Sequence, residues 1–237
     1  MNDLYKVLRE GSCATQKIIV GFSGGKDSVA LLDLCNRYFK DVYVFWMYFV
    51  NHCMLQDNYF RYIEKKYNVK ILRIPHYELS MYYQENRYLE TSVELQQTPQ
   101  IYFSDVENYV RDFFGVKWIA YGMMACESIE RQAMLRNNGG IDYEHAKLYP
   151  LAFWNNDKVF RYLKTNNIRL PTEYDFSTRS VSNPFDPNAQ ILIKTYYPGD
   201  WEKVVDKFPY ANAVHARTVF EVRRYQKNAK RRKEKQE

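Results

Sequence analysis

Six consecutive residues near the amino end have the types and order of a phosphate-binding loop: Ser23, Gly24, Gly25, Lys26, Asp27 and Ser28. They directly follow an apolar run and directly precede a helical pattern. Two glycines let the backbone turn tightly and approach a ligand with no side chain in the way. The amides that open the helix point toward such a ligand, and the helix dipole makes that end partly positive. With the serine hydroxyls and the Lys26 ammonium as further donors, the segment predicts a site for phosphate or pyrophosphate.

The loop differs from a Walker A loop in two ways. Position 20 is Val where that pattern needs Gly, and Lys26 is followed by Asp27. Because the Asp27 carboxylate would repel phosphate directly, we expect it to orient its neighbours or to hold a Mg²⁺ ion that bridges phosphate oxygens.

The alternative to a phosphate site is a plain strand-to-helix connection in which the glycines serve only the turn. The order of all six residues at the end of a strand favours the phosphate site.

Alternating strand and helix patterns predict the elements that position this loop. Buried strands are expected at 17–23, 42–49, 69–74 and 116–121, and helices at 28–39, 55–67 and 103–114. This alternation predicts an α/β fold, a Rossmann-like parallel sheet with helices on both faces. Ligands of such sheets bind beyond the carboxyl ends of the strands. Functional residues are therefore expected just after Val20, Phe49 and Ala120.

The remainder of the chain is patterned differently. Residues 77–100 are polar and tyrosine-rich, which indicates helix and loop, and 172–188 indicate a long loop. Helices are expected at 157–166, 201–207 and 211–230. We therefore divide the chain into an α/β domain at 1–150 that carries the predicted phosphate loop, a small helical and loop region at 151–221, and a basic tail at 222–237.

Composition limits the class of protein. The chain has 237 residues, of which 46% are hydrophobic and 26% charged, typical of a globular protein. No window approaches 18 apolar residues and the amino end is not a secretory signal, so we expect a cytoplasmic protein that does not enter a membrane. Four scattered cysteines without a Cys-x-x-Cys pair argue against a zinc site or a disulfide scaffold.

The positive charge is concentrated at the carboxyl end. Net charge is +6, and residues 222–237 alone hold eight Lys or Arg and two Glu. The tail, Arg223 to Lys235, is interpreted either as a solvated helix end or as a segment that binds nucleic acid or an acidic protein.

The hexapeptide resembles the PP-loop of the N-type ATP pyrophosphatase and adenine nucleotide α-hydrolase superfamily. With Lys at its fourth position, it is most similar to the branch named after phosphoadenosine phosphosulfate (PAPS) reductase, which includes DndC-like and IbrA-like proteins. Two later segments support that branch: Gly122-Met-Met-Ala-Cys-Glu127-Ser128-Ile-Glu-Arg131, and the Pro-Leu-x-x-Trp segment that begins at Pro150. The resemblance covers residues 15 to 175.

The resemblance implies where an adenine nucleotide binds and what happens to it. ATP or a PAPS-type nucleotide would place its phosphates on Ser23, Gly24, Gly25, Lys26 and Ser28, with Mg²⁺ at Asp27. The cofactor-binding set extends to Asn51, Gly122, Glu127 and Ser128. Lys26, Asp27 and Arg131 would be the catalytic residues. The implied reaction is attack on the α-phosphorus with release of pyrophosphate.

Departures from the family pattern leave two alternatives open. The reductases carry a reactive cysteine in a carboxyl-terminal segment, whereas the last cysteine here is Cys126. A sulfonucleotide reductase would therefore need an external thiol. The cysteine pairs that hold an iron–sulfur cluster in some relatives are missing, so no cluster is expected. Met124 replaces a family Arg, which favours the second alternative: a non-catalytic nucleotide- or nucleic-acid-binding subunit of a DndC-like, IbrA-like or phage-related complex.

Two positions also have a purely structural interpretation. Glu127 and Arg131 are four residues apart and would form an ordinary helix surface pair, or else Arg131 would clamp a phosphate.

Asn51 stands where the family has an Asp-Thr-Gly sequence after the second strand, and we expect it to supply the donor toward adenine or ribose.

Overall fold

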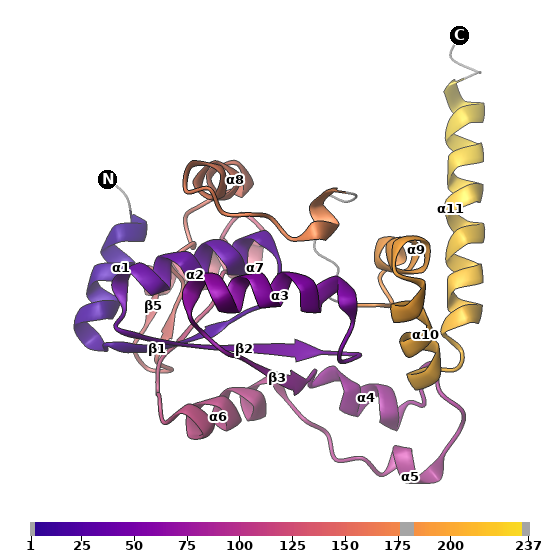
Figure 1. Ribbon diagram of the computed structural model, residues 1–237, viewed down its shortest axis with the longest axis horizontal. Helices are drawn as coiled ribbons and strands as arrows, with labels where there is room; N and C mark the ends of the chain where they lie inside the picture. The colour runs from indigo at the N-terminus through magenta and orange to yellow at the C-terminus, as the bar shows by residue number, and fades with distance from the viewer. Residues whose placement is uncertain (1–2, 176–182, 234–237) are drawn as a thin grey trace.

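The computed structural model describes residues 3–175 and 183–233, and its centre is a six-stranded sheet (Figure 1). The strand order is β3-β2-β1-β4-β6-β5. The strands are β1 Lys17–Gly21, β2 Asp41–Tyr48, β3 Ile71–Pro75, β4 Ile119–Ala120, β5 Ile141–Asp142 and β6 Lys147–Leu148. Neighbours pair in parallel except β5 and β6, which are antiparallel. The predicted Rossmann-like α/β fold is confirmed, with an added antiparallel edge that the sequence patterns did not indicate.

Strand β1 lies at the point where the chain changes direction across the sheet. It pairs with β2 on one side, with Lys17 opposite Asp41, and with β4 on the other, with Ile19 opposite Ile119. The chain runs outward from β1 through β2 to β3 and then crosses back past β1 to β4, so the direction of strand addition reverses at β1. In parallel sheets, ligands bind beyond the carboxyl ends of the strands at such a point, here those of β1 and β4.

Helices cover both faces of the sheet. Helices α1 Asp3–Ala14, α2 Lys26–Tyr38, α3 Met54–Tyr67 and α8 Asn156–Thr165 lie on one face, and α6 Phe103–Phe114 lies on the other (Figure 1). Successive strand residues point to opposite faces. In β1, Val20 joins the core under α2 and α3, whereas Ile19 joins the core under α6. Helix α7, Ile129–Asn138, follows β4.

A third apolar cluster joins the carboxyl-terminal helices to the ends of β2 and β3. Its helices are α4 Glu78–Gln84, α9 Pro187–Tyr196, α10 Pro198–Lys207 and the start of α11 Ala211–Lys233. The short helices α5 Val93–Gln96 and η1 Thr172–Asp175 lie outside this cluster. Phe49 and Tyr82 pack with Trp201 and Phe208 in this cluster. Helix α11 projects from the rest of the molecule (Figure 1). Within the described ranges, no helix has the length and apolarity needed to cross a membrane.

The predicted basic tail falls largely outside what the structure describes. The backbone of α11 is described to Lys233, and the Arg224 side chain is exposed. The side chain of Arg223, those from residue 225 onward, and all of Lys235 lie outside the described part of the chain.

Candidate functional site

The loop at residues 23–28 connects β1 to α2, as its sequence predicted. Gly24 has φ +80°, a conformation that side-chain-bearing residues rarely adopt, and a Cβ there would come within 3.2 Å of the Phe60 ring. Gly25 is the extended N-cap residue, so helix α2 begins at Lys26. The first amides of α2 lack partners within the helix and face the end of β1.

The two serines hold the loop in shape. The Gly25 amide donates to Ser23 Oγ at 3.4 Å, the Ser23 hydroxyl donates to Ser28 Oγ at 3.2 Å, and the Ser28 hydroxyl donates to the Gly25 carbonyl at 2.8 Å. These bonds connect both ends of the turn. The loop is therefore organised without a ligand.

Lys26 and Asp27 form a close ion pair. Lys26 Nζ lies 2.8 Å and 2.6 Å from the two Asp27 carboxylate oxygens, and Lys26 as a whole is only 8% exposed. Burial raises the pKa of Asp27, and the nearby Glu127 carboxylate adds to the rise, which outweighs the opposing effect of Lys26. The Glu127 carboxylate is itself paired with the Arg131 guanidinium, so the two carboxylates near the loop are matched by two cations.

Residues from later in the chain cover this pair. The Lys26 ammonium lies 5.8 Å from the centre of the Phe160 ring on α8, and the Lys26 amide donates to the Tyr174 hydroxyl at 3.3 Å. Sequence reasoning did not identify Phe160 or Tyr174, because neither residue type at its position signals a phosphate site.

The segment after β4 packs directly on the loop. A Cβ at Gly122 would come within 3.2 Å of the Asp27 backbone and 3.4 Å of the Ser28 amide, so any larger residue would crowd the loop backbone here. Glu127 accepts from the Met124 amide at 3.2 Å and influences Asp27 electrostatically. The structure thus brings two of the predicted residues, Gly122 and Glu127, to the loop.

Ser128 and Arg131 make local contacts at the start of α7. Ser128 Oγ caps α7 by accepting from the Arg131 amide at 3.1 Å. The Arg131 guanidinium pairs with Glu127, and its side chain is 44% exposed. This is the helix pair that the four-residue spacing indicated, and it leaves the guanidinium facing solvent near the loop.

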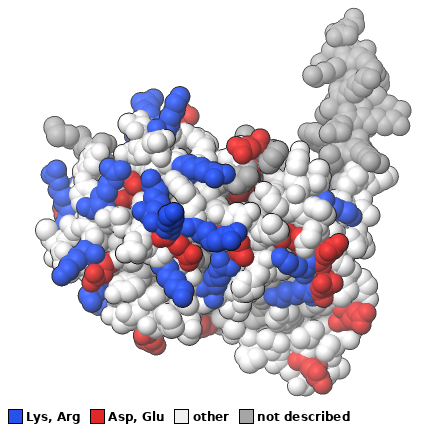
Figure 2. Space-filling view, viewed as in Figure 1, with Lys and Arg blue, Asp and Glu red and all other residues white. Residues whose placement is uncertain are grey.

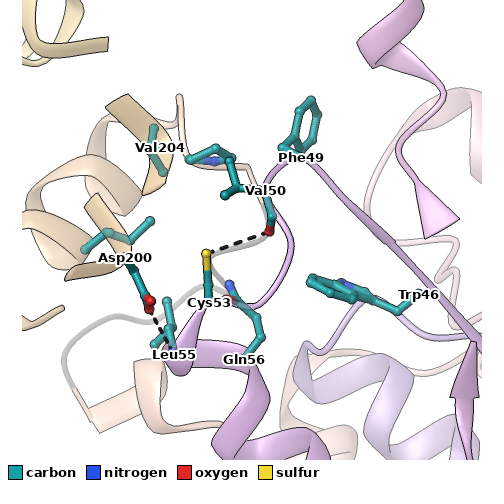
Figure 3. Close-up of a pocket in the computed structure, with 10 residues that line it drawn as sticks. Trp46, Phe49, Val50, Cys53, Leu55, Gln56, Asp200 and Val204 are labelled. Carbon is teal, nitrogen blue, oxygen red and sulfur yellow. Dashed lines mark hydrogen bonds between the residues drawn. The ribbon is translucent and has the colours of Figure 1, made fainter. Parts of the chain in front are cut away.

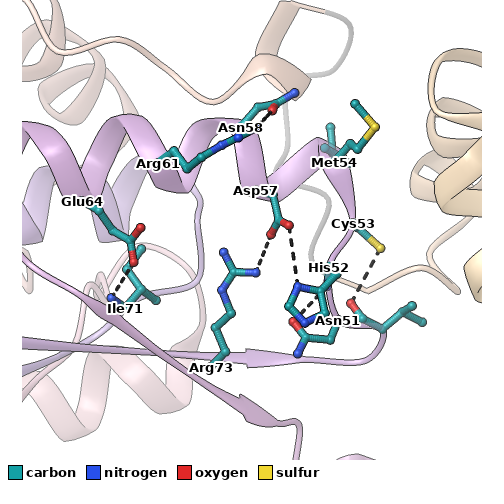
Figure 4. Close-up of polar contacts among 12 residues, drawn as sticks. Asn51, His52, Cys53, Met54, Asp57, Asn58, Arg61, Glu64, Ile71 and Arg73 are labelled. Atoms are coloured by element: carbon teal, nitrogen blue, oxygen red, sulfur yellow. Dashed lines mark hydrogen bonds and ion pairs between the residues drawn. The ribbon is translucent and has the colours of Figure 1, made fainter.

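Asn51 lies in the turn that follows β2 and is engaged locally. Its side-chain oxygen accepts from the His52 amide at 2.9 Å, beside the ion pair between Arg73 and Asp57 (Figure 4). Asn51 does not line the pocket beside the loop that is described next. The donor role expected for Asn51 therefore stays a prediction.

An aromatic pocket of about 180 Å³ adjoins the loop at the carboxyl ends of the strands. It is lined by Gly21, Phe22, Ser23, Phe45, Trp46, Met47, His76, Phe103 and Tyr121. His76 is stacked between Phe49 and Tyr77, with ring centres 4.5 Å and 4.7 Å away. Burial lowers the pKa of His76, and its Nδ1 accepts from the Glu78 amide at 3.3 Å, which requires the neutral ring. Aromatic residues at strand ends were the available sequence signal for this pocket.

A second cavity lies between the start of α3 and helices α9 and α10 (Figure 3). Cys53 and Asp200 lie at its wall, and burial raises the pKa of the Cys53 thiol to about 12. Its volume of about 20 Å³ is enough for one water molecule and for no organic ligand. We therefore assign it to packing.

Metal-ligating side chains are sparse in the described part of the chain. Within residues 3–175 and 183–233, no group of three or more His, Cys, Asp or Glu side chains is arranged to hold a metal ion. Asp27 and Glu127 are two carboxylates at one site, which is the contribution a protein commonly makes to a Mg²⁺ that also binds substrate phosphates. The described side chains therefore do not form a metal site on their own, and the Mg²⁺ expected at Asp27 stays a prediction.

Comparison with known proteins identifies the family. Among solved structures, the chain is similar to the NH₃-dependent NAD synthetase of Campylobacter jejuni in complex with nitrate, with 14% identity, a TM-score of 0.47, and coverage of 92% of this chain and 94% of that one. It is also similar to the U34-tRNA thiolase NcsA of Methanococcus maripaludis with its 4Fe–4S cluster, with 14% identity, a TM-score of 0.42, and coverage of 89% and 78%. No curated protein matches. The phosphoadenosine phosphosulfate reductase domain matches residues 17–181, which span the loop, the sheet and α8, and the chain therefore belongs to that family.

Proposed function

We propose that this protein binds an adenine nucleotide with its phosphates on residues 23–28, and that it catalyses cleavage or transfer at the α-phosphate with release of pyrophosphate. The observation that carries the proposal is the loop itself. Gly24 at φ +80° and Gly25 as N-cap direct the first amides of α2 toward the carboxyl end of β1. Gly122 packs closely on the backbone of Asp27 and Ser28 at the start of this helix. A helix start of this kind binds phosphate through amide donors and the helix dipole.

The aromatic pocket supports placement of the base. It adjoins the loop at Ser23 and is lined mainly by apolar and aromatic side chains, which suits a flat heterocycle. His76 offers a neutral imidazole edge in that pocket, because burial lowers its pKa. A base in the pocket would leave the ribose and phosphates to run over Ser23 toward Lys26.

Nucleotide binding requires the Lys26–Asp27 pair to separate. The ammonium then turns from the carboxylate to the phosphates, while the amide of Lys26 exchanges the Tyr174 hydroxyl for a phosphate oxygen. Asp27 and Glu127 would hold Mg²⁺, which supplies neutralisation of phosphate charge when it is bound.

The chemistry rests on positioning and charge. A nucleophile forms a bond to the α-phosphorus while the bond from that phosphorus to the β-bridging oxygen breaks, and pyrophosphate leaves with the electron pair. Lys26 stabilises the charge that develops on the leaving group, and the exposed Arg131 turns from Glu127 to do the same. The residues contribute little covalent chemistry, so shape and charge account for the rate.

The test measures nucleotide-induced shifts in melting temperature for ATP, AMP, adenosine phosphosulfate and PAPS, together with pyrophosphate release from ATP. Lys26→Ala and Asp27→Ala should abolish release, whereas Lys40→Ala, an exposed lysine beyond the far end of α2, should not. Wild-type turnover unaffected by both loop changes contradicts the proposal. Sulfite formed from PAPS with an added thiol identifies a sulfonucleotide reductase instead. A melting shift with no turnover of any nucleotide identifies a non-catalytic binding subunit.

A further inference from the structure

A third concavity, larger than the two described above, lies between the carboxyl-terminal half of α2 and helix α8. It has a volume of about 410 Å³ and is lined by Tyr5, Arg37, Trp154, Lys158, Arg161, Tyr162, Thr165 and Asn166. We call it the α2–α8 groove. Arg37 lies about 16 Å from Lys26 along α2, whereas on α8 the groove residues Lys158 and Arg161 flank Phe160, whose ring centre lies 5.8 Å from the Lys26 ammonium.

The groove is positively charged. Helix α8 carries Lys158, Arg161 and Lys164 against a single acid, Asp157. Lys158 and Arg161 are exposed, and neither forms an ion pair with any residue in the described part of the chain. Lys and Arg also gather over the wider face formed by α2, α3 and α8 (Figure 2). Unpaired cations on one face of a molecule attract a polyanion.

Aromatic rings lie between these cations. Trp154 and Tyr162 have ring centres 5.5 Å apart in an edge-to-face arrangement, and Trp154 is only partly buried. The Arg37 guanidinium lies 5.9 Å from the Tyr162 ring centre. An acidic peptide would use the cations and leave the rings unused. Nucleic acid uses both, because its bases stack on aromatic faces while its phosphates meet Lys and Arg.

The wall of the groove is held rigidly from below. The buried Asp33 carboxylate accepts from Arg37 Nε at 2.8 Å and from the Tyr162 hydroxyl, and a second Arg37 nitrogen donates to the Asn166 side chain at 2.8 Å. Arg37 and Tyr162 are therefore fixed before any ligand arrives. The exposed Lys158 and Arg161 side chains can adjust to the phosphate positions of a flexible nucleic acid strand.

We propose that the α2–α8 groove binds single-stranded nucleic acid, with a base stacked against Trp154, whose ring meets Tyr162 edge to face, and with backbone phosphates on Lys158 and Arg161. This inference is independent of the chemistry proposed at residues 23–28. It concerns a surface separate from the basic tail. A single strand is required because the faces of bases in a duplex are covered by the neighbouring base pairs of the stack.

The test uses the full chain and a short fluorescein-labelled single-stranded oligonucleotide of mixed sequence, followed by fluorescence anisotropy over a series of salt concentrations. The double variant Lys158→Ala/Arg161→Ala should bind about tenfold more weakly. Two lost phosphate contacts should also lower the slope of log affinity against log salt by about 1.4. The matched control Lys70→Ala/Lys117→Ala removes the same charge from exposed positions outside the groove and should bind as the wild type does.

A second measurement isolates stacking from charge. Oligonucleotide binding should quench tryptophan fluorescence in the wild type, and Trp154→Phe should remove part of that quenching while it keeps an aromatic ring in place. Three results overturn the proposal: the groove variant binds like the control; a duplex of the same length binds equally well with the same loss on mutation; or a polyglutamate peptide, and not the oligonucleotide, loses affinity.

Discussion

Gly24 shows how one residue type sets the shape of the phosphate loop. Its φ of +80° reverses the chain between the end of β1 and the N-cap of α2. A side chain would strain that conformation and would also press on Phe60. The same residue therefore controls both the local stability and the direction in which the first α2 amides point.

Gly24→Ala should lower the free energy of unfolding by about 1–2 kcal/mol, because the left-handed conformation is unfavourable for alanine. It should also abolish the nucleotide-induced shift in melting temperature. Gly115→Ala is the matched control, since Gly115 has φ +62° with open space around it at the end of α6. Urea unfolding measures the backbone strain, which both variants share. The nucleotide-induced melting shift measures loss of the site, which only Gly24→Ala should show. Retention of the shift in Gly24→Ala would contradict the role of the loop.

His76 should make stability depend on pH. Burial lowers its pKa below the usual value near 6.5, so the unfolded chain binds a proton that the folded protein does not. Stability should therefore be complete above the unfolded pKa and decrease as pH falls through 6.5 toward the lowered folded value. The slope for one proton is at most about 1.4 kcal/mol per pH unit.

His76→Phe should flatten this part of the profile while it preserves stacking between Phe49 and Tyr77. Urea unfolding of both proteins across the interval from neutral to mildly acidic pH provides the measurement. If the profile of the variant is as steep as that of the wild type, other groups cause the pH dependence of stability. His215, whose pKa is also lowered by burial, is one such group.

At the level of elements, α10 holds the turn that joins β2 to α3. The buried Asp200 carboxylate accepts from the Met54 and Leu55 amides at 2.8 Å and 3.0 Å and so caps α3. One turn and two turns later on α10, Lys203 donates to the His52 carbonyl and Lys207 to the Phe49 carbonyl. Three side chains from one helix thus fix the backbone that borders Asn51.

Asp200→Asn should lower the free energy of unfolding by about 1–2 kcal/mol, because an amide supplies one acceptor oxygen where two capping bonds need two. Asp206→Asn makes the same chemical change at an exposed position of α10 and should be close to neutral. Chemical denaturation of the two variants tests this. Equal stability would show that the α3 cap is satisfied by other groups.

Sequence patterns predicted the elements that are deeply buried on one face. Helices α2 and α3 have regular apolar positions and their predicted bounds lie close to the observed ones. Helix α7 was missed because its sequence is weakly amphipathic, with Leu135 buried and Ile129 exposed. Strands β5 and β6 are two residues each, too short for a periodic signal, and β4 has two residues where six were expected.

Helix α9 was missed for a different reason. Its first residue, Pro187, fell within the segment predicted as a long loop on account of its prolines. Asp186 accepts from the Asn188 and Ala189 amides, and Pro187 occupies the first helical turn. An acidic N-cap followed by proline is a helix start signal, so the information was present in the sequence. The pocket beside the loop, by contrast, combines rings of β2, of the residues that follow β1, β3 and β4, and of the first residue of α6, so it needed tertiary structure.

For the molecule as a whole, the net positive charge comes from the carboxyl-terminal tail, while the rest of the chain is close to neutral. Net charge is +6, residues 222–237 account for a balance of +6, and the rest of the chain is close to neutral. That neutrality conceals an uneven surface, because cations gather over α2, α3 and α8 (Figure 2). A neutral average therefore says little about which partners the body attracts.

Replacing the eight Lys and Arg residues of 222–237 by Gln should weaken binding to nucleic acid and reduce its salt dependence, because each lost phosphate contact removes counterion release. The nucleotide-induced melting shift should stay unchanged, since α11 projects from the body (Figure 1). Anisotropy and thermal melting of the same preparation provide both readings. A lost melting shift would show that the tail takes part in the nucleotide site.

The Tyr174 hydroxyl on the Lys26 amide has a consequence for what this loop can discriminate. A tyrosine that follows 148 residues later competes for the same donor as any incoming anion, and Asp27 competes for the ammonium. Free sulfate or phosphate must displace both with few contacts to offset the loss. If the loop binds phosphate groups as proposed, a molecule that also fills the neighbouring aromatic pocket would make enough further contacts to offset both losses, so small inorganic ions should bind more weakly than a nucleotide.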